Sequence, residues 1–155
     1  MEQKTKVIAE SGKQEIQITR EFDLPLELLF KAYVEPKIVE QWMENKVVKL
    51  ESRKHGGYQF QKTDPKGNVV FGAHGVIHDF ITNEKIIRTF EMDNAPFGIQ
   101  LEFLNFKTIH NNKSELKIRT VFETVEQRDQ LLKLPFAQGL NMAHNRLQEI
   151  AKKLN

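Results

Sequence analysis

The stretch KAYVEPKIVEQWM, residues 31–43, predicts two short helices in immediate succession and ends near Trp42, the only tryptophan of the chain. Apolar residues recur at helical spacing both before and after Pro36. A proline disfavours helical geometry in the residue before it, but it is well accepted in the first turn of a helix, where the amides have no intrahelical partner. The pattern therefore predicts helices near 25–33 and 36–43.

In the segments on either side of this helical pair, apolar residues recur with the period of two that is typical of strands. EIQITREF (15–22) alternates apolar and polar side chains, which is typical of a half-buried strand. Residues 45–124 contain further strand-like segments between turn sequences, and the pair Gly56–Gly57 is expected to supply the positive φ angles of a tight hairpin. A bulge or bend is expected near Gly72 or Gly75, because the segment around them is too long for a straight strand.

After these strands the apolar period returns to that of a helix. Thr124 and Gln127 have the spacing of a capping box, and Pro135 is expected to separate a short helical segment from a long final helix over 136–153. The order of elements predicts a single α+β domain over 1–155, with an antiparallel sheet of six or seven strands.

Composition places the chain among ordinary globular proteins and narrows its chemistry. With 39% hydrophobic residues, 28% charged residues and a formal net charge of +2, the chain lacks the basic excess of a nucleic-acid binder. The most basic segment, NKVVKLESRK (45–54), is interpreted as the solvated face of a strand, so nucleic acid is not an expected partner. The absence of cysteine excludes disulfides, thiol nucleophiles and thiolate metal sites, and it suits a reducing compartment.

No segment of the sequence predicts a membrane span or a secretory signal. No apolar run approaches the ~18 residues that indicate a spanning helix, and the N-terminal residues have no apolar core. Residues 1–13 are expected to be flexible or poorly ordered. We therefore expect a cytoplasmic protein with no membrane span.

Four segments carry a resemblance that runs in the same order over nearly the whole chain. They are DLPLELLFKAYVEPKIVEQWM (23–43), RKHGGYQF (53–60), FGAHGVIHDFITNEKIIRTF (71–90) and FAQGLNMAHNRLQEI (136–150). On these segments the chain resembles the activator of heat shock protein 90 ATPase-like family, within the START-like helix-grip superfamily that includes birch-pollen-allergen-like proteins and polyketide cyclases. The resemblance implies a curved antiparallel sheet wrapped around the long C-terminal helix, with a cavity between them.

The same resemblance gives the helical pair a role. It implies that the two short helices plug the open seam of the cavity and that Trp42 sits at this seam; the alternative is that Trp42 is an ordinary core residue. Three positions depart from the family, since Met43, Phe90 and Leu140 stand where relatives often carry tryptophan. Smaller side chains there change the shape of a cavity, so the resemblance does not imply the identity of a ligand.

The sequence contains no recognisable catalytic or metal-binding motif. There is no nucleophile elbow, phosphate loop or dinucleotide fingerprint. His74 and His78 share one face of a predicted strand but lie ~13 Å apart, too far to bind one ion. We therefore expect no metal, no cofactor and no catalytic residue, and we expect a binding protein rather than an enzyme.

The candidate cavity residues are of two kinds. Arg20, Tyr58 and His144 are polar side chains in an apolar register, and Arg88 is a fourth; each either faces a ligand or is satisfied by backbone, water or solvent. The others are large apolar side chains that either line a pocket or fill the core. The full set of candidates is Arg20, Phe30, Trp42, Tyr58, Phe60, Phe71, Phe103, Phe122, Leu140 and His144.

Three functions are compatible with these features. The first is the binding of an apolar or aromatic small molecule in the cavity between the sheet and the C-terminal helix. The second is a protein-interaction module with a chaperone as its partner, as the eukaryotic relatives imply, although those relatives carry a further N-terminal domain that these 155 residues do not contain. The third is a cyclase-like or hydrolase-like enzyme, which the superfamily allows but no residue cluster supports.

Overall fold

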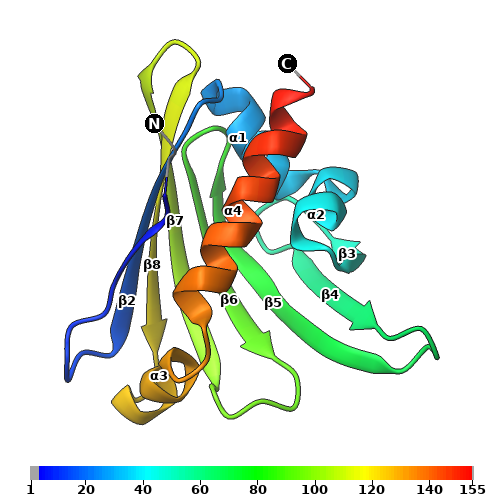
Figure 1. The fold of residues 1–155 in the computed structure, drawn as a ribbon, viewed down its shortest axis with the longest axis vertical. Coiled ribbons are helices and arrows are strands. Elements are labelled where there is room, and N and C mark those ends of the chain that lie inside the picture. The colour runs from blue at the N-terminus through cyan, green and yellow to red at the C-terminus, as the bar shows by residue number, and fades with distance from the viewer. Residues whose placement is uncertain (1–3, 155) are drawn as a thin grey trace.

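The computed structural model describes residues 4–154, which form a curved antiparallel sheet with a long helix crossing one of its faces (Figure 1). Within this range the sheet has eight strands in the spatial order β1-β2-β8-β7-β6-β5-β4-β3. In chain order the elements are β1 (Lys6–Ile8), β2 (Glu15–Phe22), α1 (Leu26–Val34), α2 (Pro36–Met43), β3 (Lys46–Leu50), β4 (Gly57–Thr63), β5 (Val69–Ile81), β6 (Lys85–Met92), β7 (Ile99–His110), β8 (Lys113–Phe122), α3 (Val125–Leu132) and α4 (Phe136–Lys152).

The topology of the sheet places its first long strand beside its last one. Strands β3 to β8 follow one another as antiparallel neighbours, and β2 pairs with β8 along its whole length. The buried apolar side chains of the sheet and of helices α1, α2 and α4 form one continuous core. This arrangement confirms the predicted α+β class, with an antiparallel sheet around a long C-terminal helix (Figure 1).

The two helices predicted around Pro36 are confirmed. Helix α1 ends at Val34, and Glu35 has the extended geometry (φ −96°, ψ 118°) that a residue before proline favours. Helix α2 begins at Pro36 and is followed by Glu44, which takes a left-handed conformation with a φ of 56°. The chain therefore turns sharply at both ends of α2. Pro36 explains the first turn from the sequence, whereas no sequence signal marks the left-handed conformation of Glu44.

Pro135 separates α3 from α4, also as predicted. The hydroxyl of Thr124 accepts a hydrogen bond from the amide of Gln127 at 3.1 Å and so caps α3. The reciprocal bond of the capping box is missing, because the Oε1 atom of Gln127 is buried and has no hydrogen-bond partner among residues 4–154. Only half of the predicted capping box is formed.

The sheet has one strand more than the six or seven predicted. The additional strand β1 pairs with β2 through three residues, from Lys6 opposite Thr19 to Ile8 opposite Gln17. Three residues are too few to show an alternating pattern, so no sequence signal reveals this strand. It lies within the segment 1–13 that was expected to be poorly ordered; residues 1–3 of that segment lie outside the described residues.

The tight turn before β4 is built differently from the prediction. The positive φ angle belongs to His55 (φ 69°), and neither Gly56 nor Gly57 has one. Gly56 is needed for another reason, since a Cβ atom on it would lie 2.0 Å from the carbonyl oxygen of Glu51. The predicted role of the glycine pair is therefore wrong: Gly56 permits a close approach of two backbone segments rather than an unusual dihedral angle.

Strand β5 has two irregularities, one on each side of the segment that contains Gly72 and Gly75. The register against β4 shifts between Val69 and Phe71, close to Gly72 as predicted, and the register against β6 shifts between Ile77 and Asp79. Gly75 permits a close approach of β6, because a Cβ atom there would lie 2.0 Å from the carbonyl oxygen of Thr89. It would also lie 2.7 Å from the hydroxyl oxygen of Tyr58, which donates to the same carbonyl.

Candidate ligand-binding cavity

The indole of Trp42 satisfies a carbonyl that Pro36 leaves without a partner in the preceding helix. In a continuing helix the carbonyl of Ala32 would accept a hydrogen bond from the amide of residue 36, but proline has no N–H. The Nε1 atom of Trp42 donates to this carbonyl oxygen instead, at 2.7 Å in the interior. The indole also packs against Tyr33, with ring centroids 5.1 Å apart. Helices α1 and α2 are therefore locked together by the tryptophan.

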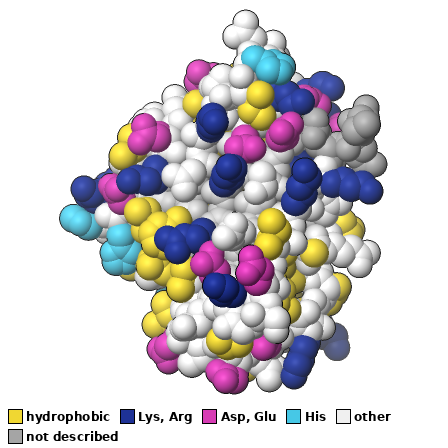
Figure 2. Space-filling view, turned by 90° about the vertical axis from the view of Figure 1, so that its left-hand side faces the viewer, with side chains coloured by type: hydrophobic (Ala, Val, Ile, Leu, Met, Phe, Trp, Pro, Cys, Tyr) yellow, Lys and Arg dark blue, Asp and Glu magenta, His cyan; other side chains and the backbone are white. Residues whose placement is uncertain are grey.

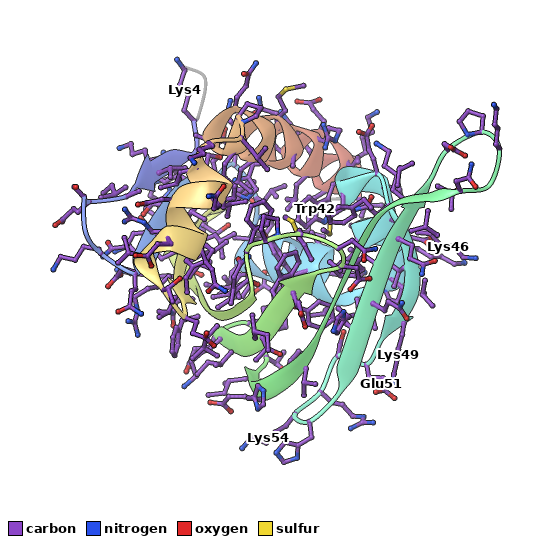
Figure 3. The ribbon with its side chains drawn as sticks, turned by 90° about the horizontal axis from the view of Figure 1, so that it is seen from below. Lys4, Trp42, Lys46, Lys49, Glu51 and Lys54 are labelled. Carbon is purple, nitrogen blue, oxygen red and sulfur yellow. The ribbon has the colours of Figure 1, made fainter. Side chains whose placement is uncertain are left out.

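Beside this helical pair the fold leaves a cavity of about 210 Å³ between the sheet and the helices. Figure 3 shows Trp42 in the interior, between the long helix and the strands. The apolar lining from the sheet consists of Ile16, Ile18, Phe60, Phe90, Met92 and Ile118. The lining from helices α2, α3 and α4 consists of Val39, Trp42, Met43, Leu131, Phe136, Leu140 and Ala143.

The polar part of the wall is a row of side chains on three neighbouring strands. Arg88 on β6, Glu102 on β7 and Thr120 on β8 are register partners, and Gln100 lies two residues from Glu102 on the same strand. The Nε atom of Arg88 donates to Glu102 Oε1 at 2.8 Å, and the two side chains are 11% and 15% exposed. The Arg88 guanidinium also lies 5.0 Å from the ring centroid of Tyr58. The cavity therefore borders a paired, internally neutral charge centre.

Tyr33, Tyr58 and Arg88 keep fixed protonation states near neutral pH. Burial raises the pKa of both Tyr33 and Tyr58, so their phenols stay protonated. Burial acts to lower the pKa of Arg88, but Tyr58 and Glu102 beside it outweigh that effect and raise the pKa above its ordinary value. These three groups hold hydrogens and charge in place, which suits binding better than acid–base catalysis.

The predicted cavity residues are distributed over several environments. Those that line the cavity are Trp42, Phe60 and Leu140. Phe30 and Phe122 are buried in the core outside the lining, and Phe71 is half-buried on β5. Tyr58 lies behind the wall, where its ring supports the guanidinium of Arg88.

Phe103 lies on the opposite face of the sheet from the cavity. The side chains of β7 alternate, so that Gln100 and Glu102 face the helices while Phe103 faces outward beneath the guanidinium of Arg119, 4.4 Å from its ring centroid. Large apolar residues stand on both faces of this strand, so alternation alone does not identify the inner face. Gln100 and Glu102 are therefore site residues that the sequence reasoning misses.

Arg20 and His144 belong to a separate buried cluster beyond the indole of Trp42. The Nδ1 atom of His144 lies 2.6 Å from the hydroxyl of Thr5, and the guanidinium of Arg20 donates to the same hydroxyl at 3.4 Å and to Asn141 Oδ1 at 3.3 Å. The other ring nitrogen of His144 is buried with no hydrogen-bond partner in the described part of the chain. The cluster ties β2 and α4 to the segment that precedes β1, and it lies outside the cavity lining.

His144 should make the stability of the protein depend on pH. Burial, and then the charge of Arg20, lower the pKa of His144 to about 3 in the folded protein, against 6.5 ordinarily. Above pH 6.5 the ring is neutral in both states, whereas at lower pH only the unfolded chain takes up the proton. His144 alone should therefore lower the free energy of unfolding by about 2 kcal/mol between pH 8 and pH 5, at about 1.4 kcal/mol per unit below 6.5.

Urea unfolding at several pH values checks this expectation. The variant His144→Asn keeps a polar group near Thr5 but cannot be protonated, so its stability should depend less steeply on pH than that of the wild type. His78→Asn, on the exposed part of β5, is the matched control and should retain the contribution of His144. Equal slopes for the wild type and His144→Asn would show that the buried imidazole is not the group responsible.

The basic segment 45–54 has its charges partly neutralised by neighbouring carboxylates. Lys49 Nζ lies 3.4 Å from Glu51 and Lys54 Nζ lies 3.7 Å from Asp79, and Figure 3 shows these lysines along β3 and its following turn. Figure 2 shows basic and acidic side chains interspersed on the face it displays. These surfaces have no feature that selects nucleic acid, and the absence of such a partner remains a prediction.

The described residues also offer no cluster of three or more metal-ligating side chains. His74 contacts two carboxylates through its opposite ring nitrogens, Glu91 at 3.3 Å and Asp93 at 2.8 Å, so these three side chains do not converge on one point. That no metal binds remains a prediction. No helix between residues 4 and 154 is long and apolar enough to cross a membrane.

An antiparallel sheet curved around a C-terminal helix, with two short helices after the first long strand and an apolar cavity between the layers, defines a helix-grip domain of the START-like class. The family model described as activator of Hsp90 ATPase homolog 1-like protein matches residues 23–152. The chain belongs to this family, and membership supports a ligand-binding or interaction module in general.

Solved structures of bacterial proteins share the same fold. A protein from Rhodobacter sphaeroides is 19% identical with a TM-score of 0.84, and the match covers 96% of this chain and 99% of that one. A Mycobacterium smegmatis protein is 17% identical with a TM-score of 0.82 and 94% of each chain covered. A Staphylococcus epidermidis protein is 20% identical with a TM-score of 0.77 and the same coverage. At these identities the likeness shows the fold alone, and no curated protein matches the sequence.

Proposed function

We propose that this protein binds an apolar or aromatic small molecule in the cavity beside Trp42, in the cytoplasm and without catalysing a reaction. The observation that carries the proposal is the cavity itself, about 210 Å³ of space with mainly apolar walls. Its lining combines side chains of the sheet with side chains of helices α1 to α4, so the space lies between the two layers of the fold. A concave, mainly apolar site with a few polar groups is typical of a small-molecule pocket.

The volume limits the size of that ligand. A dry apolar cavity of roughly 150 Å³ is enough to hold benzene, whereas sites for drug-sized molecules measure roughly 300–1,000 Å³. With about 210 Å³, the cavity fits one ring carrying a short substituent. Long acyl chains are not expected to fit without a change in the helices.

The chemistry of the wall supports binding more than it supports a reaction. Among the titratable side chains of the lining, Tyr33 and Arg88 keep their protons near neutral pH, and the carboxylate of Glu102 accepts a hydrogen bond from Arg88 Nε at 2.8 Å. His144, the one histidine buried near Trp42, is not part of the lining. A reaction would need an acid, base or nucleophile that contacts the substrate.

A panel of one-ring aromatic compounds tests the proposal by calorimetry and thermal unfolding. A ligand that binds only the folded state raises the melting temperature in proportion to RT ln(1 + [L]/Kd), so binders should give saturable heats and a shift that grows with concentration. Trp42 fluorescence should change as well, since no other tryptophan competes with it.

The matched variants place the same bulky ring inside or outside the cavity. Leu140→Trp should fill the space and abolish binding, whereas Met142→Trp, on the exposed side of the same helix, should bind as the wild type does. If no compound in the panel binds, the proposal fails, and the interaction module that the family's chaperone-activating members suggest becomes the better hypothesis. The corresponding measurement is then ATPase stimulation of a chaperone of the Hsp90 class.

A further inference from the structure

The side chain of Gln100 is a buried hydrogen-bonding group on the cavity wall that the protein itself does not satisfy. It is 3% exposed and lines the cavity, and its Nε2 atom has no hydrogen-bond partner within residues 4–154. Buried polar groups nearly always have a partner, and leaving a donor unpaired costs free energy. Because Nε2 itself is buried, the side chain of Gln100 must turn toward the cavity to reach an acceptor there.

The neighbouring charges determine what kind of acceptor fits. Arg88 and Glu102 are bonded to each other at 2.8 Å, so the polar row is already neutral as a whole. A carboxylate or phosphate ligand would bring a further negative charge into this confined space beside Glu102. A neutral oxygen acceptor satisfies Gln100 without that cost.

Further donors lie at this end of the cavity. The hydrogen bond to Glu102 uses only the Nε atom of Arg88, so the rest of the guanidinium is not taken up by it. The hydroxyl of Thr120 is the register neighbour of Glu102 and lines the same cavity. An acceptor placed beside Gln100 therefore lies among several N–H and O–H groups, while the ring of the ligand lies among the apolar residues.

We infer that the ligand is a neutral aromatic or alicyclic molecule bearing one carbonyl-type oxygen, which accepts a hydrogen bond from Gln100 Nε2 while its ring occupies the apolar part of the cavity. The inference rests on the proposed function and adds to it the chemical class of the ligand. It assigns to Gln100 the selection of a carbonyl compound over a hydrocarbon of the same shape.

Three probes of nearly equal shape test this selection: acetophenone, its hydrocarbon isostere α-methylstyrene, and benzoate. Dissociation constants are measured by calorimetry or NMR titration for the wild type, for Gln100→Leu and for the control Met92→Leu, which alters the packing of the wall without altering its polarity. The dissociation constant of α-methylstyrene is divided by that of acetophenone, and this ratio is compared between proteins. The different hydration of the two probes cancels in that comparison.

The ratio should fall about tenfold in Gln100→Leu and stay unchanged in Met92→Leu, as expected for the loss of one hydrogen bond. Benzoate should bind at least about tenfold more weakly than acetophenone to the wild type. Gln100→Met, with a side chain of similar length, replaces the leucine variant if that variant does not fold.

The possible outcomes separate this inference from the proposed function. If α-methylstyrene binds but the ratio is the same in the wild type and Gln100→Leu, the role of Gln100 is wrong while the apolar cavity stands. If benzoate binds more tightly than acetophenone, the ligand class is anionic and the inference is overturned. If none of the three binds, the proposed function fails and this inference fails with it.

Discussion

Replacing Trp42 with alanine is expected to lower the free energy of unfolding by about 3–5 kcal/mol, measured by urea denaturation. The indole is 5% exposed, so its removal opens a large buried space that adjoins the existing cavity. It also leaves the carbonyl of Ala32 without a donor, because Pro36 cannot supply one. Trp42→Phe retains most of the apolar contacts but loses the N–H, so it should cost less, about 1–3 kcal/mol.

Added small molecules separate these two contributions in Trp42→Ala. Indole should restore stability by filling the space and donating to the Ala32 carbonyl, whereas benzothiophene has nearly the same shape and no N–H. The melting temperature of the alanine variant should therefore rise more with indole than with benzothiophene at equal concentration. Equal shifts would mean that the hydrogen bond across the two helices contributes little, and a loss below about 1 kcal/mol would contradict the buried position of the ring.

The positions of the prolines explain why the helix boundaries of the fold are predictable from the sequence. Pro36 and Pro135 restrict the backbone wherever they stand, so the helix boundaries beside them follow from the chain itself. The role assigned to Gly56 fails for the opposite reason. Its close contact with the carbonyl of Glu51 depends on how two segments meet in space, and a glycine needed for space looks the same in sequence as one needed for its dihedral angle.

The site is less predictable, because its polar wall depends on which face of a strand points inward. On β7 the apolar residues Leu101 and Phe103 face out, while Gln100 and Glu102 face the cavity, contrary to the usual preference. The pairing of Arg88 with Glu102 across neighbouring strands stabilises the inward position of Glu102. Such a pairing depends on the register of the sheet, which a single sequence does not reveal.

Replacing Arg88 with methionine is expected to lower the free energy of unfolding by about 3–5 kcal/mol. The substitution keeps much of the apolar stem but leaves the carboxylate of Glu102, 15% exposed, without its partner at 2.8 Å. The contact between the guanidinium and the ring of Tyr58 is lost as well. Arg119→Met is the matched control: this exposed arginine also lies over an aromatic ring, that of Phe103, and its loss should cost less than about 1 kcal/mol.

Removing both charges together should restore most of the free energy of unfolding that Arg88→Met alone loses. In Arg88→Met/Glu102→Leu no buried charge is left unpaired, and the two new apolar side chains can pack against each other across β6 and β7. The double variant should therefore lie within about 1–2 kcal/mol of the wild type, with a large coupling energy in the double-mutant cycle. If the stability losses of Arg88→Met and Glu102→Leu, measured singly, add up to the loss of the double variant, the pair is not energetically coupled. The double variant should still bind α-methylstyrene, because the apolar part of the cavity stays intact, so stability and ligand affinity can be measured separately on the same protein.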